Sequence, residues 1–308
     1  MKSDVSDLRS LLLDLRSAFA RKENVMARAR QLAGKTDNSV LATLVAYDLQ
    51  AGSYVASARA NPTYRSEWAN QLAELICPFL GYGDRLLEVG VGEATTLAYV
   101  AQALSSKKPR MLGFDVSWSR VAVARSFVCE KSVDARLFVA DLFRIPLADQ
   151  SVDVVYSSHS LEPNGGREEE AIAECLRVAR KAVVLVEPIY ELAPKEAQAR
   201  MESHGYVRDL MGCAKRLGAD VHSLRLLDLN ANPLNPSGAL ILKIPGCDGK
   251  GLPTIEAGWE CPLTSLPLQE CDDLFLSVDS GLAYPVMRGI PLLRQEHAVV
   301  ASRLISGG

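Results

Sequence analysis

The sequence predicts an α/β fold built on a mostly parallel sheet. From residue 85 to residue 187, short apolar runs alternate with stretches in which apolar residues recur every three to four positions. This alternation is typical of parallel strands joined by helices. A turn-rich link at residues 230–238 joins the last two apolar runs, which predicts an antiparallel pair at the end of the sheet.

Composition and charge narrow the class of protein. With 308 residues and 48% hydrophobic content, the chain can bury one large core and a small further module. The net charge of -3 provides no general attraction to nucleic acid or to an anionic membrane, so we expect neither as a partner. No run is long enough to span a membrane and no signal peptide is visible, so we expect a cytoplasmic protein. The oligomeric state stays open, a homodimer included.

Helical periodicity comes first along the chain. It predicts helices over residues 5–32, 39–57 and 65–80, with a break at Asn61-Pro62 before the third. Three helices are therefore expected before the first strand, and we assign residues 1–80 to an N-terminal helical segment.

A glycine turn follows the first apolar run, at residues 86–89. Gly90 and Gly92 carry no Cβ, so the backbone there can approach a bound cofactor closely. A dinucleotide-binding turn requires a third glycine, where this chain has Thr95. The carboxylate of Glu88 suits a cationic, amine-bearing ligand better than a pyrophosphate. An ordinary buried strand with a turn stays the alternative for this stretch.

This turn resembles the first motif of class I S-adenosylmethionine (SAM)-dependent methyltransferases. In that family an acidic residue precedes G-x-G-x-G, and the chain departs from the pattern only at Ala94. The pattern I-P-L-x-D-x-S-x-D-x-V at residues 145–155 resembles the ubiquinone/menaquinone methyltransferase-like branch. The resemblance covers residues 85–244, and we assign residues 81–246 to a SAM-binding domain. It implies a Rossmann-like sheet with an antiparallel last strand, and SAM as cofactor.

The ends of the other strands supply the remaining cofactor contacts. Asp115 ends the second strand, where a carboxylate can accept hydrogen bonds from both hydroxyls of a ribose, and Val116 follows it. The resemblance implies that Asp141 accepts from the adenine amino group while the backbone N–H of Leu142 meets the ring. We add Ser158, at the end of the fourth strand, to this set.

A general base is expected beside the cofactor. His159 follows the fourth strand, and its ordinary pKa lies near neutrality. Glu162, Glu187 and Tyr190 are further candidates on the acceptor side. The alternative for His159 is a structural role in which it hydrogen-bonds a loop or holds Glu162.

Two tyrosines of the N-terminal segment are candidates for substrate contact. In methyltransferase-like proteins such a segment commonly covers the cofactor and substrate as a lid, and Tyr47 and Tyr54 stand in its second predicted helix. The alternative is that both tyrosines only pack on the core.

The fourth strand also restricts the acceptor. Amino-directed methyltransferases carry Asn-Pro-Pro-Tyr or Asp-Pro-Pro-Tyr there, and this chain has Ser158-His159-Ser160-Leu161. We therefore expect methyl transfer to an oxygen or carbon of a small-molecule acceptor. The alternatives are an RNA- or protein-modifying methyltransferase, an NAD(P)-dependent oxidoreductase and a SAM-binding protein without catalysis.

The C-terminal sequence changes character. Residues 245–253 are rich in glycine and proline, as linkers are. The patterns C-P-x-T-x-x-P-L and L-A-Y-P-x-x-x-G-I-P-x-L within residues 259–293 resemble the small zinc-ribbon-like family that activates methyltransferases as a separate subunit. Thr264 stands where zinc-binding members pair a second cysteine with Cys261, so we expect no metal. We assign residues 254–300 to this module and expect it to stabilise the catalytic domain in cis.

Overall fold

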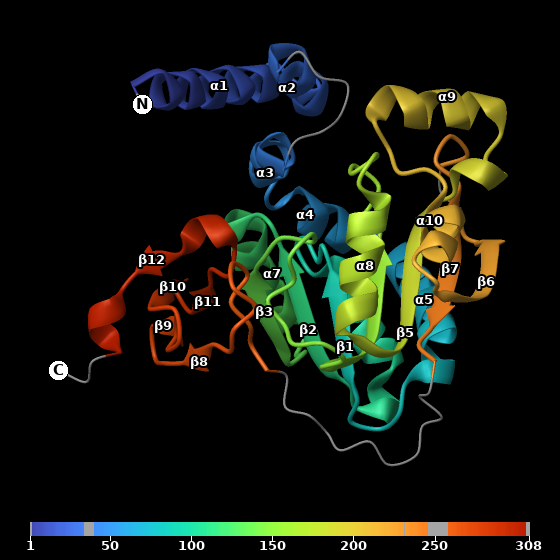
Figure 1. The fold of residues 1–308 in the computed structure, drawn as a ribbon. Helices are drawn as coiled ribbons and strands as arrows, with labels where there is room; N and C mark the ends of the chain where they lie inside the picture. The colour runs from blue at the N-terminus through green and yellow to red at the C-terminus, as the bar shows by residue number, and fades with distance from the viewer. Residues whose placement is uncertain (1, 34–39, 231, 246–257, 306–308) are drawn as a thin grey trace.

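The computed structural model describes residues 2–33, 40–230, 232–245 and 258–305. A central sheet carries helices on both faces, further helices lie above the carboxyl ends of its strands, and a small antiparallel sheet stands beside one edge (Figure 1). The observed architecture is therefore the α/β fold that the sequence predicts, with the additional small sheet.

The large sheet has seven strands in the order β3-β2-β1-β4-β5-β7-β6. All neighbours are parallel except around β7, which runs antiparallel to both β5 and β6. This confirms the predicted mostly parallel sheet and its antiparallel last strand. The strands are β1 (Arg85–Val89), β2 (Arg110–Asp115), β3 (Ala135–Val139), β4 (Val152–Ser158), β5 (Ala179–Pro188), β6 (Asp220–Leu226) and β7 (Ser237–Lys243).

Helices cover both faces because successive strand residues point to opposite sides. In β4, Val154 and Tyr156 pack in the cluster that contains α5, α6 and α7, whereas Val155 packs in the cluster that contains α8 and α10 (Figure 1). The α-helices are α1 (Lys2–Ala20), α2 (Val25–Ala33), α3 (Val40–Asp48), α4 (Ser53–Ala60), α5 (Pro62–Ile76), α6 (Thr95–Ala103), α7 (Trp118–Glu130), α8 (Glu168–Val178), α9 (Lys195–His204) and α10 (Leu210–Arg216). Short 3₁₀ helices lie at Cys77–Phe79, Ser105–Lys107, Tyr190–Leu192, Gln295–His297 and Ser302–Leu304.

The N-terminal segment is more divided than predicted. The single helix expected over residues 5–32 is a pair, α1 and α2, because the chain turns at Lys22 with a φ of 61°. The second predicted helix is interrupted at Gly52, where φ is 98°, a conformation that glycine adopts at little cost. Five helices, not three, thus precede β1 in the described part of the chain. Residues 34–39, where that second helix was expected to begin, lie outside the described residues.

The chain passes directly from α8 into β5 and later forms a short surface helix. α8 ends at Val178, because Ala179 is extended and begins β5. Residues 188–202 contain most of α9, which buries Ala197 and Met201. Two buried side chains four residues apart are enough to hold one face of a short helix.

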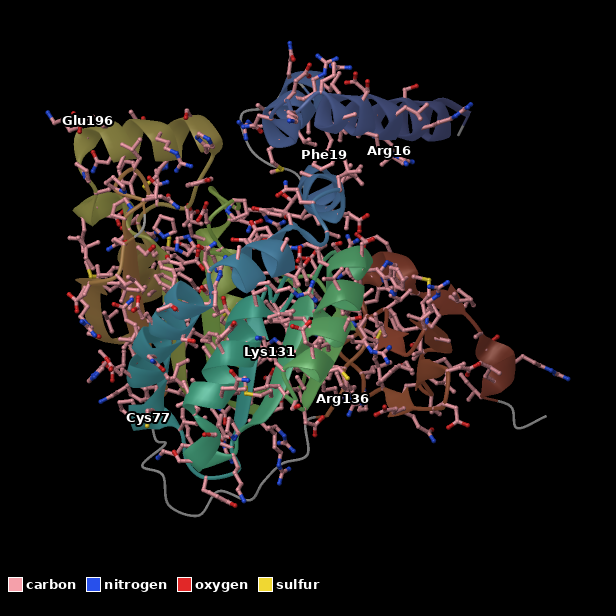
Figure 2. The ribbon with its side chains drawn as sticks, turned by 180° about the vertical axis from the view of Figure 1, so that it is seen from behind. Arg16, Phe19, Cys77, Lys131, Arg136 and Glu196 are labelled. Atoms are coloured by element: carbon pink, nitrogen blue, oxygen red, sulfur yellow. The ribbon has the colours of Figure 1, made fainter. Side chains whose placement is uncertain are left out.

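The small sheet packs against the β3 edge of the large one. Its strands are β8 (Gln269–Glu270), β9 (Leu274–Ser277), β10 (Leu282–Met287), β11 (Ile290–Pro291) and β12 (Val299–Val300). Leu293 N–H donates to the carbonyl of Val139 in β3 (2.8 Å), which pairs part of an otherwise open edge. Arg136, at the same edge in Figure 2, forms an ion pair with Glu270.

Trp259 anchors this contact from the chain segment before β8. Its ring packs edge-on against Phe138 of β3 at 5.0 Å between centroids and against Phe275 of β9 at 5.3 Å. All three aromatic side chains are buried in one cluster. We call residues 258–305 the C-terminal module. The predicted linker falls mainly on residues 246–257, outside the described residues.

The described residues show neither a membrane-spanning helix nor a metal-binding cluster. No described helix has both the length and the apolar character needed to cross a bilayer. The described residues also contain no group of three or more His, Cys, Asp or Glu side chains arranged to hold a metal ion. Cys261 instead lies 3.2 Å from the hydroxyl of Tyr284.

Candidate functional site

A cavity of about 400 Å³ lies at the carboxyl ends of β1, β2 and β4, under α3, α4 and α5. Parallel α/β sheets place their ligands at this end of the strands. Every residue predicted to bind the cofactor lines it, namely Glu88, Gly90, Gly92, Asp115, Val116, Asp141, Leu142 and Ser158. His159, Glu162, Tyr47 and Tyr54 line the same cavity.

The glycine turn leaves no room for side chains. Gly90 and Gly92 have φ values of 66° and 56°, in the left-handed region. A Cβ on Gly90 would stand 2.3 Å from Cβ of Ser160, and one on Gly92 would stand 2.4 Å from Nη2 of Arg120. Glycine is therefore required at both positions by conformation and by space.

Glu88 is buried at the end of β1. Its Oε2 accepts a hydrogen bond from the hydroxyl of Tyr156 at 2.7 Å. Burial raises the pKa of Glu88 to about 8, although the Tyr156 hydrogen bond acts in the opposite direction. This shift favours the uncharged acid near neutral pH.

We predict that Glu88→Gln flattens the pH dependence of stability. The folded protein keeps the Glu88 proton up to about pH 8, whereas an unfolded carboxyl loses it near its ordinary value of 4.5. The free energy of unfolding should therefore fall as pH rises between these values, by about 1.4 kcal/mol per pH unit. Urea unfolding at pH 5, 6.5 and 8 measures this slope. Equal slopes in wild type and Glu88→Gln would contradict the prediction.

Asp115 organises the start of α7. Its Oδ2 accepts from the backbone N–H of Gly92 (3.0 Å) and its Oδ1 from that of Ser117 (2.9 Å). Ser117 in turn caps α7 by accepting from the N–H of Arg120. Each carboxylate oxygen has a second lone pair, so Asp115 can still accept hydrogen bonds from a ligand in the cavity.

Arg120 is a cavity residue that the sequence analysis missed. Only 8% of it is exposed, and its guanidinium lies 3.6 Å from Asp115 and over the rings of both Tyr47 (5.0 Å) and Tyr54 (4.7 Å). The stack joins the N-terminal helices to α7. A single arginine in a helix with no distinct apolar face gives no sequence signal for such a position.

Glu93 attaches the N-terminal helices to the glycine turn. Its carboxylate accepts from the backbone N–H of Gly52 (3.0 Å) and of Val55 (2.7 Å), at the N-terminus of α4. An acid there satisfies free N–H groups and complements the helix dipole. The sequence analysis assigned Glu93 no role, because its partners lie about 40 residues away.

His159 stands in a line of polar groups on the acceptor side. Its Nδ1 lies 2.6 Å from Oε2 of Glu162 and its Nε2 lies 2.8 Å from Oγ of Ser237. A carboxylate only accepts, so Nδ1 carries a proton and Nε2 of the neutral ring accepts from Ser237. Burial lowers the pKa of His159, but the hydrogen bond and charge of Glu162 outweigh it, and the pKa ends above its ordinary value.

Neither of the other acceptor-side candidates lines the cavity. Glu187 is buried beneath it and accepts from the backbone N–H groups of Ser160, Leu161 and Glu162, which holds the loop that carries His159. Burial raises the pKa of Glu187 to about 6. Tyr190 donates to Glu202 at 2.5 Å, away from the cavity.

Trp68 and Ser237 were missed on this side. Trp68 of α5 donates from Nε1 to Oγ of Ser158 (3.2 Å), and its ring lies 5.8 Å from that of His159. Ser237 was read only as part of the link at residues 230–238, yet it begins β7, which the sheet places next to β5.

Part of the chain matches a known protein family. Residues 86–182 match the family described as Methyltransferase domain, and no curated protein matches the chain. Similar solved structures include the [4+2]-cyclase SpnF, with 16% identity, 57% of this chain and 80% of that chain covered, and a TM-score of 0.47. Another is geranyl diphosphate C-methyltransferase from Streptomyces coelicolor A3(2), solved with S-adenosyl-L-homocysteine. It has 12% identity, 56% of this chain and 78% of that chain covered, and a TM-score of 0.44.

A third similar structure is a complex of the Haloferax volcanii Trm112 methyltransferase activator with a methyltransferase. It has 18% identity, 62% of this chain and 95% of that chain covered, and a TM-score of 0.47. The domain match covers β1 to the start of β5, which contains the glycine turn, Asp115 and Asp141. The chain therefore carries a methyltransferase domain on a Rossmann-like sheet, and its enzyme class is that of the SAM-dependent methyltransferases.

Proposed function

We propose that the chain transfers the methyl group of SAM to an oxygen or carbon of a small-molecule acceptor. The observation that carries this proposal is the shared cavity. It joins the glycine turn and the strand-end acids to the His159–Glu162 pair. Its volume of about 400 Å³ lies in the range of roughly 300–1,000 Å³ that small-molecule sites have.

The donors and acceptors around the cavity suit SAM. Asp115 offers free lone pairs for ribose hydroxyls, and Asp141 and Leu142 stand at the next strand end. Four buried polar atoms of the lining lack a hydrogen-bond partner among the described residues: Thr43 Oγ1, Arg65 Nε, Arg120 Nε and Ser160 Oγ. Arginine donors suit a carboxylate such as the one SAM carries. When bound, SAM supplies a methyl carbon already activated by its sulfonium.

The chain's own residues then position and deprotonate the acceptor. His159 Nε2 carries a lone pair toward the cavity side, where an acceptor hydroxyl can replace that of Ser237 and give up its proton. Glu162 holds the ring and stabilises the imidazolium that forms. The N-terminal helices, fixed by Glu93 and by the Arg120 stack, exclude water from the reaction.

The C-terminal module fits an accessory role in this proposal. It lies at the β3 edge and contributes no residue to the cavity lining. Its sequence resembles a family of activator subunits. We propose that it stabilises the catalytic domain in cis.

Ligand-dependent stability tests the cofactor assignment. SAM and S-adenosylhomocysteine should raise the melting temperature, because a ligand at 100 times its Kd adds about 2.7 kcal/mol to the folded state. NAD and NADP should not. Asp115→Asn should lose the response to SAM, since an amide NH₂ cannot accept ribose hydrogen bonds. Asp134→Asn, an exposed change in the loop before β3, is the control.

Stabilisation by NAD or NADP alone would overturn the proposal in favour of an oxidoreductase. An unaltered SAM response in Asp115→Asn would remove Asp115 from the cofactor site. The acceptor is then sought by the release of S-adenosylhomocysteine in the presence of small hydroxylated or enolisable compounds.

A further inference from the structure

A second cavity, of about 620 Å³, lies on the other side of α3 from the methyl-transfer site. Four parts of the chain form it: the N-terminal helices, the end of β3, the segment from Val116 into the start of α7, and the C-terminal module. Val116 lines both cavities. The methyl-transfer proposal does not use the second cavity.

Most of its wall is apolar. Leu12 of α1, Leu44 and Leu49 at α3, and Met287 and Leu292 of the C-terminal module are among the ten apolar side chains of the fourteen that line it. Protein interiors are packed to the density of organic crystals, and an empty apolar space loses dispersion contacts. A wall of this kind favours a ligand with an alkyl or similar apolar chain.

A buried cation stands in the same wall. Arg294 is only 7% exposed, and the one hydrogen bond of its guanidinium within the described residues is the ion-pair contact from Nη2 to Glu296 at 3.2 Å, whose side chain is 64% exposed. Its Nε is buried without a partner in that part of the chain, as is Nδ1 of His297, another lining residue. Buried guanidinium donors without partners are costly. An anionic group in the cavity would satisfy them.

The other charged residues of the wall also favour an anionic group. Arg16 lines the cavity from the face of α1 that is turned toward the rest of the molecule (Figure 2). Asp48 is the acidic lining residue, but its Oδ1 accepts from Ser117 Oγ (2.6 Å) and from the N–H of Ser119 (3.4 Å). The wall therefore carries two arginines against one carboxylate.

We propose that this cavity binds a single-chain amphiphile whose anionic head pairs with Arg294 and whose apolar chain lies along Leu44, Leu49 and Leu292. The site is separate from the methyl-transfer cavity and does not rest on the function proposed for it. Because α3 forms a wall of both cavities, a bound amphiphile would also hold the helix that carries Tyr47.

Tryptophan quenching tests this site. The probe is 12-bromododecanoate, whose bromine quenches nearby indoles. Trp118 lines the second cavity and Trp68 lines the first. We expect quenching in wild type that Trp118→Phe abolishes and Trp68→Phe leaves unchanged. Loss of quenching in Trp68→Phe instead, or no quenching in wild type, would overturn the proposal.

Charge recognition is tested with Arg294→Gln. This change should weaken dodecanoate binding at least tenfold, and dodecan-1-ol should bind wild type at least tenfold more weakly than dodecanoate. Arg303→Gln, an exposed arginine of the same module, should leave binding unchanged. Equal affinity of wild type and Arg294→Gln for dodecanoate would refute the assigned head-group site. If Arg294→Gln does not fold, the affinities of dodecan-1-ol and dodecanoate for the wild type still test the proposal. Equal affinities would refute recognition of the anionic head.

A membrane surface also combines anionic head groups with alkyl chains, so a separate experiment tests binding to it. Phosphatidylglycerol vesicles with brominated acyl chains should not quench Trp118, because the proposed site takes one dissolved molecule. Quenching by these vesicles equal to that by the dissolved probe would replace the proposal with binding to a lipid surface.

Discussion

Replacing His159 with alanine is expected to lower turnover by about 10²- to 10⁴-fold while leaving SAM affinity nearly unchanged. In the proposed function His159 is the base and the glycine turn and Asp115 hold the cofactor, so its loss should remove the base and keep the cofactor contacts. Turnover is measured as S-adenosylhomocysteine release once an acceptor is known, and SAM affinity by calorimetry.

A second variant must show that the effect of His159→Ala does not come from a change in the backbone. His159 has a φ of 57°, in the left-handed region that asparagine tolerates better than alanine. His159→Asn should therefore keep the loop and still lose activity. Unchanged turnover in both variants would end the role of His159 as a base.

The pH profile of turnover separates catalysis from loop structure. A base acts only when it is deprotonated, and Glu162 holds the pKa of His159 above its ordinary 6.5. Activity should thus fall as pH decreases through a midpoint above 6.5. In Glu162→Gln, burial acts on His159 without the opposing carboxylate, and the midpoint should move to lower pH. A profile that stays in place would assign the titration to another group.

Ending the chain after Gly251 is expected to give insoluble or inactive protein. The truncation uncovers Phe138 and the β3 edge, and it removes Trp259, Phe275, Tyr284 and Leu293 from one buried cluster. An open strand edge beside exposed apolar side chains favours aggregation. Solubility, urea unfolding and SAM binding of the truncated chain measure the effect.

A point substitution gives the same test in a full-length chain. Trp259→Ala should lower the free energy of unfolding by about 3–5 kcal/mol, the usual range for emptying a buried aromatic site. Val300→Ala, at a residue 80% exposed in the same module, should change it by less than about 0.5 kcal/mol. An active and equally stable truncation would contradict the stabilising role of the module.

The strand-end acids were predicted to meet at one edge of the sheet because their signals are local. Each of Glu88, Asp115 and Asp141 follows or ends an apolar run, and parallel strands bring their carboxyl ends to one edge. The cavity contains all three. The end of the second strand at Asp115 was likewise predicted, since it depends on neighbouring residues.

The polar groups around His159 were predicted only in part. His159 and Glu162 are three residues apart and were paired from the sequence, but Ser237 lies 78 residues from His159 and comes from a strand inserted beside β5. Glu187 was placed on the acceptor side because it ends a strand, yet it points to backbone N–H groups beneath the loop.

Short-range patterns in the sequence were sufficient for the α/β class, the glycine turn, the strand-end acids and the antiparallel last strand. These features depend on periodicity, backbone conformation and the succession of elements along the chain, which neighbouring residues specify. Tertiary packing alone decided that Glu93 caps α4, that Arg120 stacks between Tyr47 and Tyr54, and that Arg294 lines an apolar cavity between the two ends of the chain. Each of these contacts joins groups tens to hundreds of residues apart, and their burial and unpaired donors arise only when the folded chain removes water from them.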